Sequence, residues 1–150
     1  QTSHRPCIGF VGVVGLGRTE TEGYFGGGNS GTNSTKIDGL DFTTESTVNP
    51  SATLSIARQT LAGVSSSSKG YFGGGNAGST SAEIDGIDFS TEAAINPSTI
   101  LVARYYLAGV SSSSKGYFGG GTTGTYSSEI DGIDFVTEAA INPSATLSVA

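Results

Sequence analysis

One short stretch occurs three times in the chain and sets its period. A Tyr-Phe pair is followed by three glycines, and the tyrosine spacings are 71 − 24 = 47 and 117 − 71 = 46 residues. The aromatic pair suits a buried strand, and a strand that ends at a fixed interval predicts a repeat architecture. The first four residues of the motif are Tyr24, Phe25, Gly26 and Gly27, then Tyr71, Phe72, Gly73 and Gly74, then Tyr117, Phe118, Gly119 and Gly120.

The glycines of this motif are predicted to have a structural purpose. Glycine permits positive φ and a close approach of two backbones, so we expect at least one glycine of each run to show one or the other. A phosphate-binding loop is the alternative interpretation of a glycine run. It fails here because no Lys-Ser or Lys-Thr step and no helix follow the glycines.

Each repeat is predicted to contain four short strands. In the second repeat these are the apolar segment 61–64, the aromatic segment 69–75, the block 84–89 and the apolar segment 100–103. Serine-rich, glycine-rich and Asn-Pro steps separate them, and nothing has the period of a helix. Four strands in a unit of about 46 residues match a blade of a β-propeller. The closing segments of the other two repeats are 52–57 and 145–150.

The best preserved block of the repeat has the pattern Ile-Asp-Gly-x-Asp-Phe, with Leu40 at the variable position of the first copy. Ile87 and Phe89 share one face at strand period while Ile84 has the opposite parity, so Gly86 is predicted to mark a β-bulge. The paired aspartates could bind calcium, or they could shape the bulge and the turn. We favour the second interpretation because the full ligand set of a calcium loop is missing. The aspartates are Asp38 and Asp41, Asp85 and Asp88, and Asp131 and Asp134.

The repeats divide the chain into one domain of three units. The predicted limits are about 7–57, 58–103 and 104–150, with residues 1–6 forming a polar N-terminal arm. Residues 7–17 are apolar and glycine-rich, and they predict the first strand of the first unit. This run is too short to span a bilayer, so we expect no membrane insertion.

Composition and charge exclude several classes of function. The chain has 13 acidic against 7 basic residues, which argues against binding to nucleic acid or to anionic membranes. Its one histidine, His4, and one cysteine, Cys7, cannot assemble a zinc or copper site, and a catalytic triad would depend on His4 in the terminal arm. Cys7 is predicted to be a small buried hydrophobic residue. We therefore expect no enzyme activity, no cofactor and no metal site.

One aromatic pair outside the motif breaks the repeat symmetry. Tyr105 and Tyr106 stand where the preceding repeat has Gln59 and Thr60. Adjacent tyrosines could stack on a sugar or on a partner protein, or one ring could pack between blades. Both interpretations are kept, and packing is favoured.

The order of features in the third repeat resembles the Kelch repeat. Arg104 precedes the apolar strand 107–110, and a turn leads to the aromatic strand 115–120 closed by Gly-Gly, before a strand that ends at Phe135. The resemblance implies β-propeller blades, and the fold class is predicted as all-β, with three four-stranded Kelch-like antiparallel repeats. The chain is also similar to repeats in structural proteins of bacteriophages. It departs from the Kelch pattern at the tryptophan position, which holds Val48, Ile95 or Ile141.

Three blades do not close a propeller, so the terminal blades are predicted to find a neighbour. We expect self-association into a ring or a filament, or a place within a longer repeat protein. The predicted function is a non-catalytic structural or adhesive module of a virion, cell-surface or extracellular assembly. The alternatives are a Kelch-type interaction adaptor, which would be cytoplasmic, and a glycan-binding, lectin-like propeller.

Overall fold

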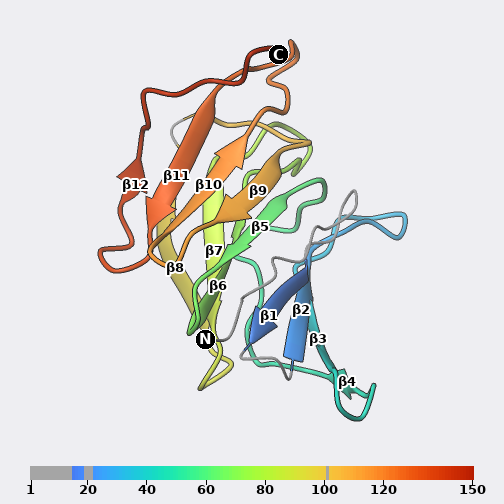
Figure 1. The fold of residues 1–150 in the computed structure, drawn as a ribbon. Helices are drawn as coiled ribbons and strands as arrows, with labels where there is room; N and C mark the ends of the chain where they lie inside the picture. The colour runs from blue at the N-terminus through green and yellow to red at the C-terminus, as the bar shows by residue number, and fades with distance from the viewer. Residues whose placement is uncertain (1–14, 19–21, 101) are drawn as a thin grey trace.

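The computed structural model describes residues 15–18, 22–100 and 102–150, and this part of the chain is all-β (Figure 1). Its strands form three four-stranded antiparallel sheets, each a meander of consecutive strands. These described residues contain no helix that is long and apolar enough to cross a membrane. The strands are β1 (Gly15–Arg18), β2 (Glu22–Gly26), β3 (Ile37–Asp41), β4 (Thr47–Val48), β5 (Ala62–Ser65), β6 (Lys69–Gly73), β7 (Glu83–Asp88), β8 (Ala94–Thr99), β9 (Ala108–Ser111), β10 (Lys115–Gly119), β11 (Ile130–Asp134) and β12 (Ala140–Ile141).

Several sequence predictions lie outside the described residues. They concern the polar arm 1–6, Cys7, His4 and most of the strand predicted over 7–17. Only the end of that strand is described, as β1.

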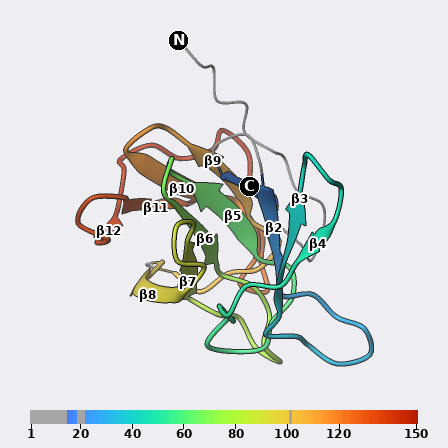
Figure 2. The same ribbon diagram turned by 90° about the horizontal axis from the view of Figure 1, so that it is seen from below.

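The three sheets follow one another across the molecule, in the order of the repeats. The strand β5 lies beside β1 on one side and beside β9 on the other. At the second of these contacts the Ser65 amide donates to the Ser111 hydroxyl at 3.0 Å. The strands β4 and β12 lie at opposite outer edges of the molecule (Figure 1), and Figure 2 shows the same succession of sheets from below. The first strands are therefore the inner ones.

Serine hydroxyls shape the hairpins that open the second and third sheets. The Ser66 hydroxyl accepts hydrogen bonds from the amides of Ser68 at 3.2 Å and Lys69 at 3.0 Å. This local bonding satisfies the amides of a tight loop and fixes the register of β5 against β6, in which Val64 pairs with Tyr71. The serine-rich step that was expected to separate two strands is therefore confirmed, and it forms a hairpin loop.

The glycine run behaves as predicted. Gly74 and Gly75 have φ of +69° and +108°, and their amides donate to Glu83 O at 2.9 Å and Arg104 O at 2.8 Å. The run thus turns the chain out of β6 and ties it to β7 and to the start of the next repeat. The corresponding angles are +73° at Gly27, +106° at Gly28, +72° at Gly120 and +82° at Gly121.

The prediction for the fourth strand was wrong. It was expected over 52–57, 100–103 and 145–150, but β4, β8 and β12 lie earlier in each repeat. The apolar residues of these strands stand opposite the glycine of the Asp-Gly step. That glycine leaves space for a large side chain, because a Cβ on Gly86 would lie 2.7 Å from Ile95 Cγ1. The facing pairs are Gly39 with Val48, Gly86 with Ile95, and Gly132 with Ile141.

The expected closing strands of the first two repeats are connecting segments with buried side chains, whereas residues 145–150 of the third repeat are exposed. Leu54 and Ile100 are almost fully buried between sheets. Their amides each donate a backbone hydrogen bond of 2.8 Å, from Leu54 to Thr35 O and from Ile100 to Ala82 O. An apolar sequence pattern predicts buried side chains, but it does not by itself predict a strand. Here the buried side chains lie on a segment that crosses from one sheet to the next.

The core consists of two clusters of side chains, one between each pair of neighbouring sheets. Ile87, Phe89 and Phe72 belong to the cluster between the first and second sheets. Ile84 and Tyr71 belong to the cluster between the second and third sheets. Both faces of the second sheet are therefore buried. The opposite parity of Ile84 is confirmed, and the register of β7 against β8 shifts between Ile84 and Gly86, as the bulge prediction expected.

Candidate assembly interface

Each sheet has two different faces, and the Tyr-Phe pair defines them. Adjacent residues of a strand point to opposite faces, so Tyr71 and Phe72 face different neighbours. We call the face with Tyr24, Tyr71 or Tyr117 the tyrosine face, and the face with the following phenylalanine the phenylalanine face. In the described molecule the tyrosine face of one sheet packs on the phenylalanine face of the next.

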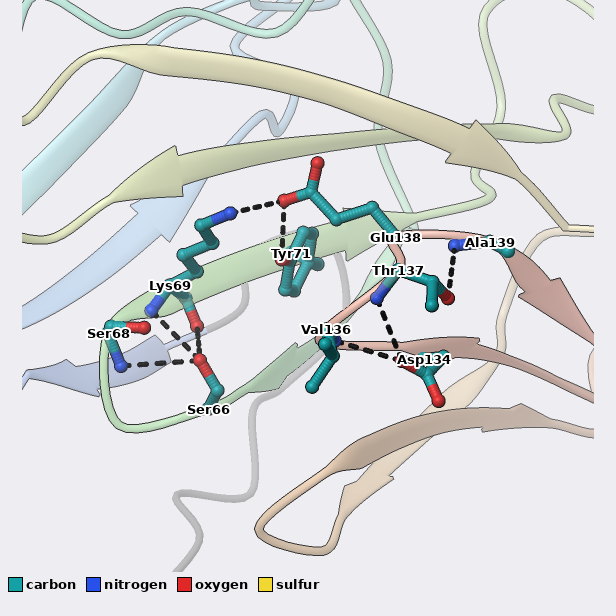
Figure 3. Close-up of polar contacts among 9 residues, drawn as sticks. All are labelled: Ser66, Ser68, Lys69, Tyr71, Asp134, Val136, Thr137, Glu138 and Ala139. Atoms are coloured by element: carbon teal, nitrogen blue, oxygen red, sulfur yellow. Dashed lines mark hydrogen bonds and ion pairs between the residues drawn. The ribbon is translucent and has the colours of Figure 1, made fainter.

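The joint between the second and third sheets combines ring stacking with an ion pair, and Figure 3 shows the polar contacts of this joint. The rings of Tyr71 and Phe135 stack with centroids 5.4 Å apart and planes 5° from parallel. The Glu138 carboxylate accepts hydrogen bonds from the Tyr71 hydroxyl at 3.0 Å and from Lys69 Nζ at 2.6 Å. One side chain of the third sheet therefore binds two side chains of β6.

A tight turn after β11 positions Glu138. The Asp134 carboxylate accepts hydrogen bonds from the amides of Val136 and Thr137, both at 2.9 Å, and the Glu138 amide donates to Asp134 O at 2.8 Å. Glu138 has φ of +58°, a left-handed conformation that is uncommon for a residue other than glycine. This turn points the carboxylate back toward the second sheet.

Electrostatics stabilise the charged form of Glu138 and the neutral form of Tyr71. The hydrogen bond from Lys69, with that from Tyr71, lowers the pKa of Glu138 below its ordinary value of 4.5, although burial opposes the shift. Burial, together with the hydrogen bond to Glu138, raises the pKa of Tyr71. The hydroxyl thus stays a donor and the carboxylate an acceptor over the ordinary pH range.

The same geometry recurs between the first and second sheets with one change of charge. Tyr24 and Phe89 stack with centroids 5.6 Å apart and planes 8° from parallel, and the Tyr24 hydroxyl lies 2.9 Å from a Glu92 carboxylate oxygen. Glu22 takes the place of Lys69, and its carboxylate lies 2.7 Å from the same hydroxyl. A phenol has one proton, so it donates to only one of these two carboxylates at a time.

In the first two repeats, the first glycine of the motif makes room for the ring of the following sheet. A Cβ on Gly73 would lie 2.7 Å from Phe118 Cζ, and a Cβ on Gly26 would lie 3.0 Å from Phe72 Cε1. Both rings are fully buried. The repeated motif therefore supplies both partners of the contact, the glycine on one face and the phenylalanine on the other.

Buried arginines join the second and third sheets to the segments that precede them, a role that sequence reasoning missed. Arg58 pairs with Asp85 at 2.5 Å and Arg104 with Asp131 at 2.9 Å, all four being almost fully buried. Arg58 Nε also donates to Gly74 O at 2.8 Å, while its own carbonyl accepts from the Gly28 amide at 3.0 Å. The one available signal was the equal separation of the two pairs, 85 − 58 = 27 and 131 − 104 = 27 residues.

The two aspartates of the Asp-Gly-x-Asp step have different structural roles. In the second and third repeats the first one pairs with the buried arginine. The second one binds the amides of the following turn, as Asp88 does with Ser90 and Thr91 at 2.9 and 3.0 Å. Within the described ranges no group of three or more His, Cys, Asp or Glu side chains is placed to hold a metal ion.

The terminal sheets expose the residues that the inner joints bury. Val64 is 2% exposed, but its counterpart Val110 on the third sheet is 63% exposed. Phe72 is fully buried, but its counterpart Phe25 on the first sheet is 41% exposed. Phe42 is 43% exposed where its counterpart Phe89 is 2% exposed. The third sheet thus presents an uncovered tyrosine face, and the first sheet an uncovered phenylalanine face.

Tyr105 and Tyr106 lie at the start of the third repeat, before β9. Their rings have centroids 4.9 Å apart at a tilt of 56°. Tyr106 is 58% exposed and has φ of +60°, while its amide donates to Thr60 O at 3.0 Å. Tyr105 forms a backbone bridge with Thr122, which bridges in turn to the exposed Tyr126. The backbone of the pair is fixed, and the Tyr106 ring is available to solvent.

No protein-family model matches this chain, and no curated protein matches it either.

Proposed function

We propose that this chain is a non-catalytic structural or adhesive module, built from Kelch-type propeller blades, that assembles through its terminal sheets. The observation that supports this most directly is the exposure of Val110, Phe25 and Phe42, whose counterparts are buried wherever a neighbouring sheet is present. An apolar face of this kind is costly in water and marks a site of association. A partner that supplies the missing sheet would cover it.

The arrangement of strands favours propeller blades as the form of the assembly. The inner strand β5 contacts both β1 and β9, and the fourth strands lie at the outer edges. Blades placed around a common axis have this order from inner to outer strand. A second copy could add three more sheets and close a ring, or successive copies could form a filament.

The use of the charged residues supports a structural role. Arg58, Asp85 and Glu138 all bind within or between sheets, and the same chemistry recurs in neighbouring repeats. Repetition of one contact along a chain is what an assembly module requires, whereas a catalytic site needs a local departure from symmetry. We place the module in a virion, cell-surface or extracellular assembly, with a cytoplasmic Kelch-type adaptor as the alternative.

The test is the oligomeric state of the protein as a function of concentration. Light scattering coupled to size exclusion should show association of the parent and its loss in Val110→Glu. The matched control is Val136→Glu, because Val136 is exposed and its counterpart Ser90 stays exposed in the fully covered second sheet. A parent that remains a stable folded monomer at every concentration would contradict the proposal.

Glycan binding is a second candidate, supported by the tyrosine pair. Tyr106 holds a largely exposed ring on a left-handed backbone, and such strain is often found at ligand sites. Tyrosine rings can stack on the apolar face of a sugar. A glycan array should then show binding that Tyr106→Ala abolishes and Tyr126→Ala changes less. Identical array profiles for parent and Tyr106→Ala would remove this candidate.

A further inference from the structure

We propose that two copies of the chain join in one defined register, in which Glu45 of one copy binds Lys115 and Tyr117 of the other and Phe42 stacks on Tyr117. This inference rests on the proposed assembly through terminal sheets and specifies its contacts. The occupant of each uncovered face is thus a second copy of this chain, joined tyrosine face to phenylalanine face.

The phenylalanine face of the first sheet already has the geometry of an inner joint. Glu45 has φ of +55°, as Glu92 has +56° and Glu138 has +58°. The Asp41 carboxylate accepts hydrogen bonds from the amides of Thr43 and Thr44, both at 2.8 Å. The turn that points a glutamate at a neighbour is therefore formed in the absence of one.

The tyrosine face of the third sheet matches the corresponding face of the second sheet residue for residue. Tyr117 pairs with Val110 and Gly132 in register, as Tyr71 pairs with its own valine and glycine. Lys115 stands opposite Asp134, as Lys69 stands opposite the aspartate of its sheet. The tyrosine face that would contact Glu45 and Phe42 of another copy therefore also has the geometry of an inner joint.

Charge favours this pairing over other contacts between copies. The first sheet has Glu22 at the lysine position, whereas the third sheet has Lys115. A joint between copies would therefore reproduce the Lys69–Glu138 pair of the second and third sheets. Two tyrosine faces brought together would instead place the Lys115 ammonium groups of both copies in one contact without a glutamate. The joint is heterologous, so its rotation decides between a closed ring and a filament.

Charge reversal tests the register. Lys115→Glu and Glu45→Lys should each weaken association by about tenfold or more in sedimentation velocity, because each sets like charges against each other. A 1:1 mixture of the two variants should associate as strongly as the parent. In that mixture the two introduced side chains, of opposite charge, meet at one kind of joint, and the native pair forms at the other. The double variant with both substitutions in one chain should also recover.

The control is Glu129→Lys, which changes charge by the same amount as Glu45→Lys. Glu129 is exposed, and the first repeat already has Lys36 at this position. It should leave association unchanged, and all variants should melt like the parent in their monomeric form. Single reversals that associate normally while Val110→Glu does not would overturn the register and leave the proposed function standing. A parent that never associates would overturn both.

Discussion

Neighbouring glycines of the repeated motif meet different physical demands. Gly73 has ordinary strand pairing, but a Cβ there would meet the ring of Phe118. Gly74 has φ of +69°, and a Cβ there would meet Leu107 Cδ1 and would lie 2.7 Å from Arg104 O. At Gly73 packing alone excludes a larger side chain. At Gly74 packing and backbone strain exclude it together.

Substitution of Gly74 by valine should therefore destabilise the fold by more than backbone strain alone would, because the new side chain also clashes with its neighbours. We expect Gly74→Val to lower the free energy of unfolding by about 2–4 kcal/mol, because a backbone carbonyl cannot move aside as a side chain can. The matched control is Gly78→Ala, since Gly78 has φ of +99° but no atom within 4 Å of a Cβ. It should cost about 1 kcal/mol. Equal losses in denaturant titrations would show that packing at Gly74 is unimportant.

Glu138 should make part of the stability dependent on pH. Its pKa in the folded protein is lowered, so the unfolded chain binds the proton first as pH falls. The contribution of the ion pair with Lys69, about 1 kcal/mol for such a partly exposed pair, is complete above the ordinary value of 4.5 and is lost as pH falls through the lowered pKa.

The measurement is the difference in free energy of unfolding between parent and Glu138→Gln, since Asp41, Asp88 and Asp134 also have lowered pKa values and titrate in both proteins. That difference should shrink on acidification. A difference that stays constant down to about pH 3 would mean that the carboxylate is not preferentially ionised in the fold.

At the scale of the elements, the buried Arg–Asp pairs connect the second and third sheets to the segments before them. Asp85→Ala leaves the guanidinium of Arg58 buried without its counter-charge and should cost about 3–5 kcal/mol. The double variant Arg58→Met/Asp85→Leu should lose less, because it removes both buried charges. Thermal unfolding of the three proteins would measure this. A double variant no more stable than Asp85→Ala would argue against desolvation as the cause.

The first three strands of the second and third repeats could be predicted from sequence because local patterns determine them. Aromatic and alternating residues mark β6 and β7, and serines mark the hairpin between β5 and β6. The fourth strand could not be placed in this way. Its defining interaction is the packing of one apolar side chain over a glycine of β7, which is a contact across strands. The apolar segment that was chosen instead is buried by a neighbouring sheet, and single-sequence patterns do not distinguish these two causes of burial.

Assembly through the terminal sheets stays a proposal, and the contacts that join the sheets within the chain could not be predicted from the sequence. The count of three repeats indicated that the ends need neighbours. The binding of Glu138 to Tyr71, and of Arg104 to Asp131, joins residues from separate segments. Nothing in the local sequence around Glu138 shows that its backbone is left-handed and therefore which way the carboxylate points.

At the scale of the whole molecule, the three sheets pack one after another through two unequal joints. Stability in such an arrangement is a sum of unit and neighbour contributions, so opening should begin at the end with the weaker joint. The joint of the first sheet has Glu22 where the other has Lys69. We expect amides of β2 and β3 to exchange with deuterium faster than those of β6 and β7, which have joints on both faces. Uniform protection across the three sheets would show that they open together.

The repeat unit of about 46 residues combines a glycine that receives the ring of the following unit with a phenylalanine whose ring packs on the glycine of the preceding unit. A tandem duplication of the coding segment would therefore add a complete sheet that fits its neighbours on both sides, with no compensating substitution elsewhere. Loss of one unit would be tolerated for the same reason. A chain of this kind can change length by recombination while its contacts stay the same, so repeat number can vary among descendants faster than the residues at the joints.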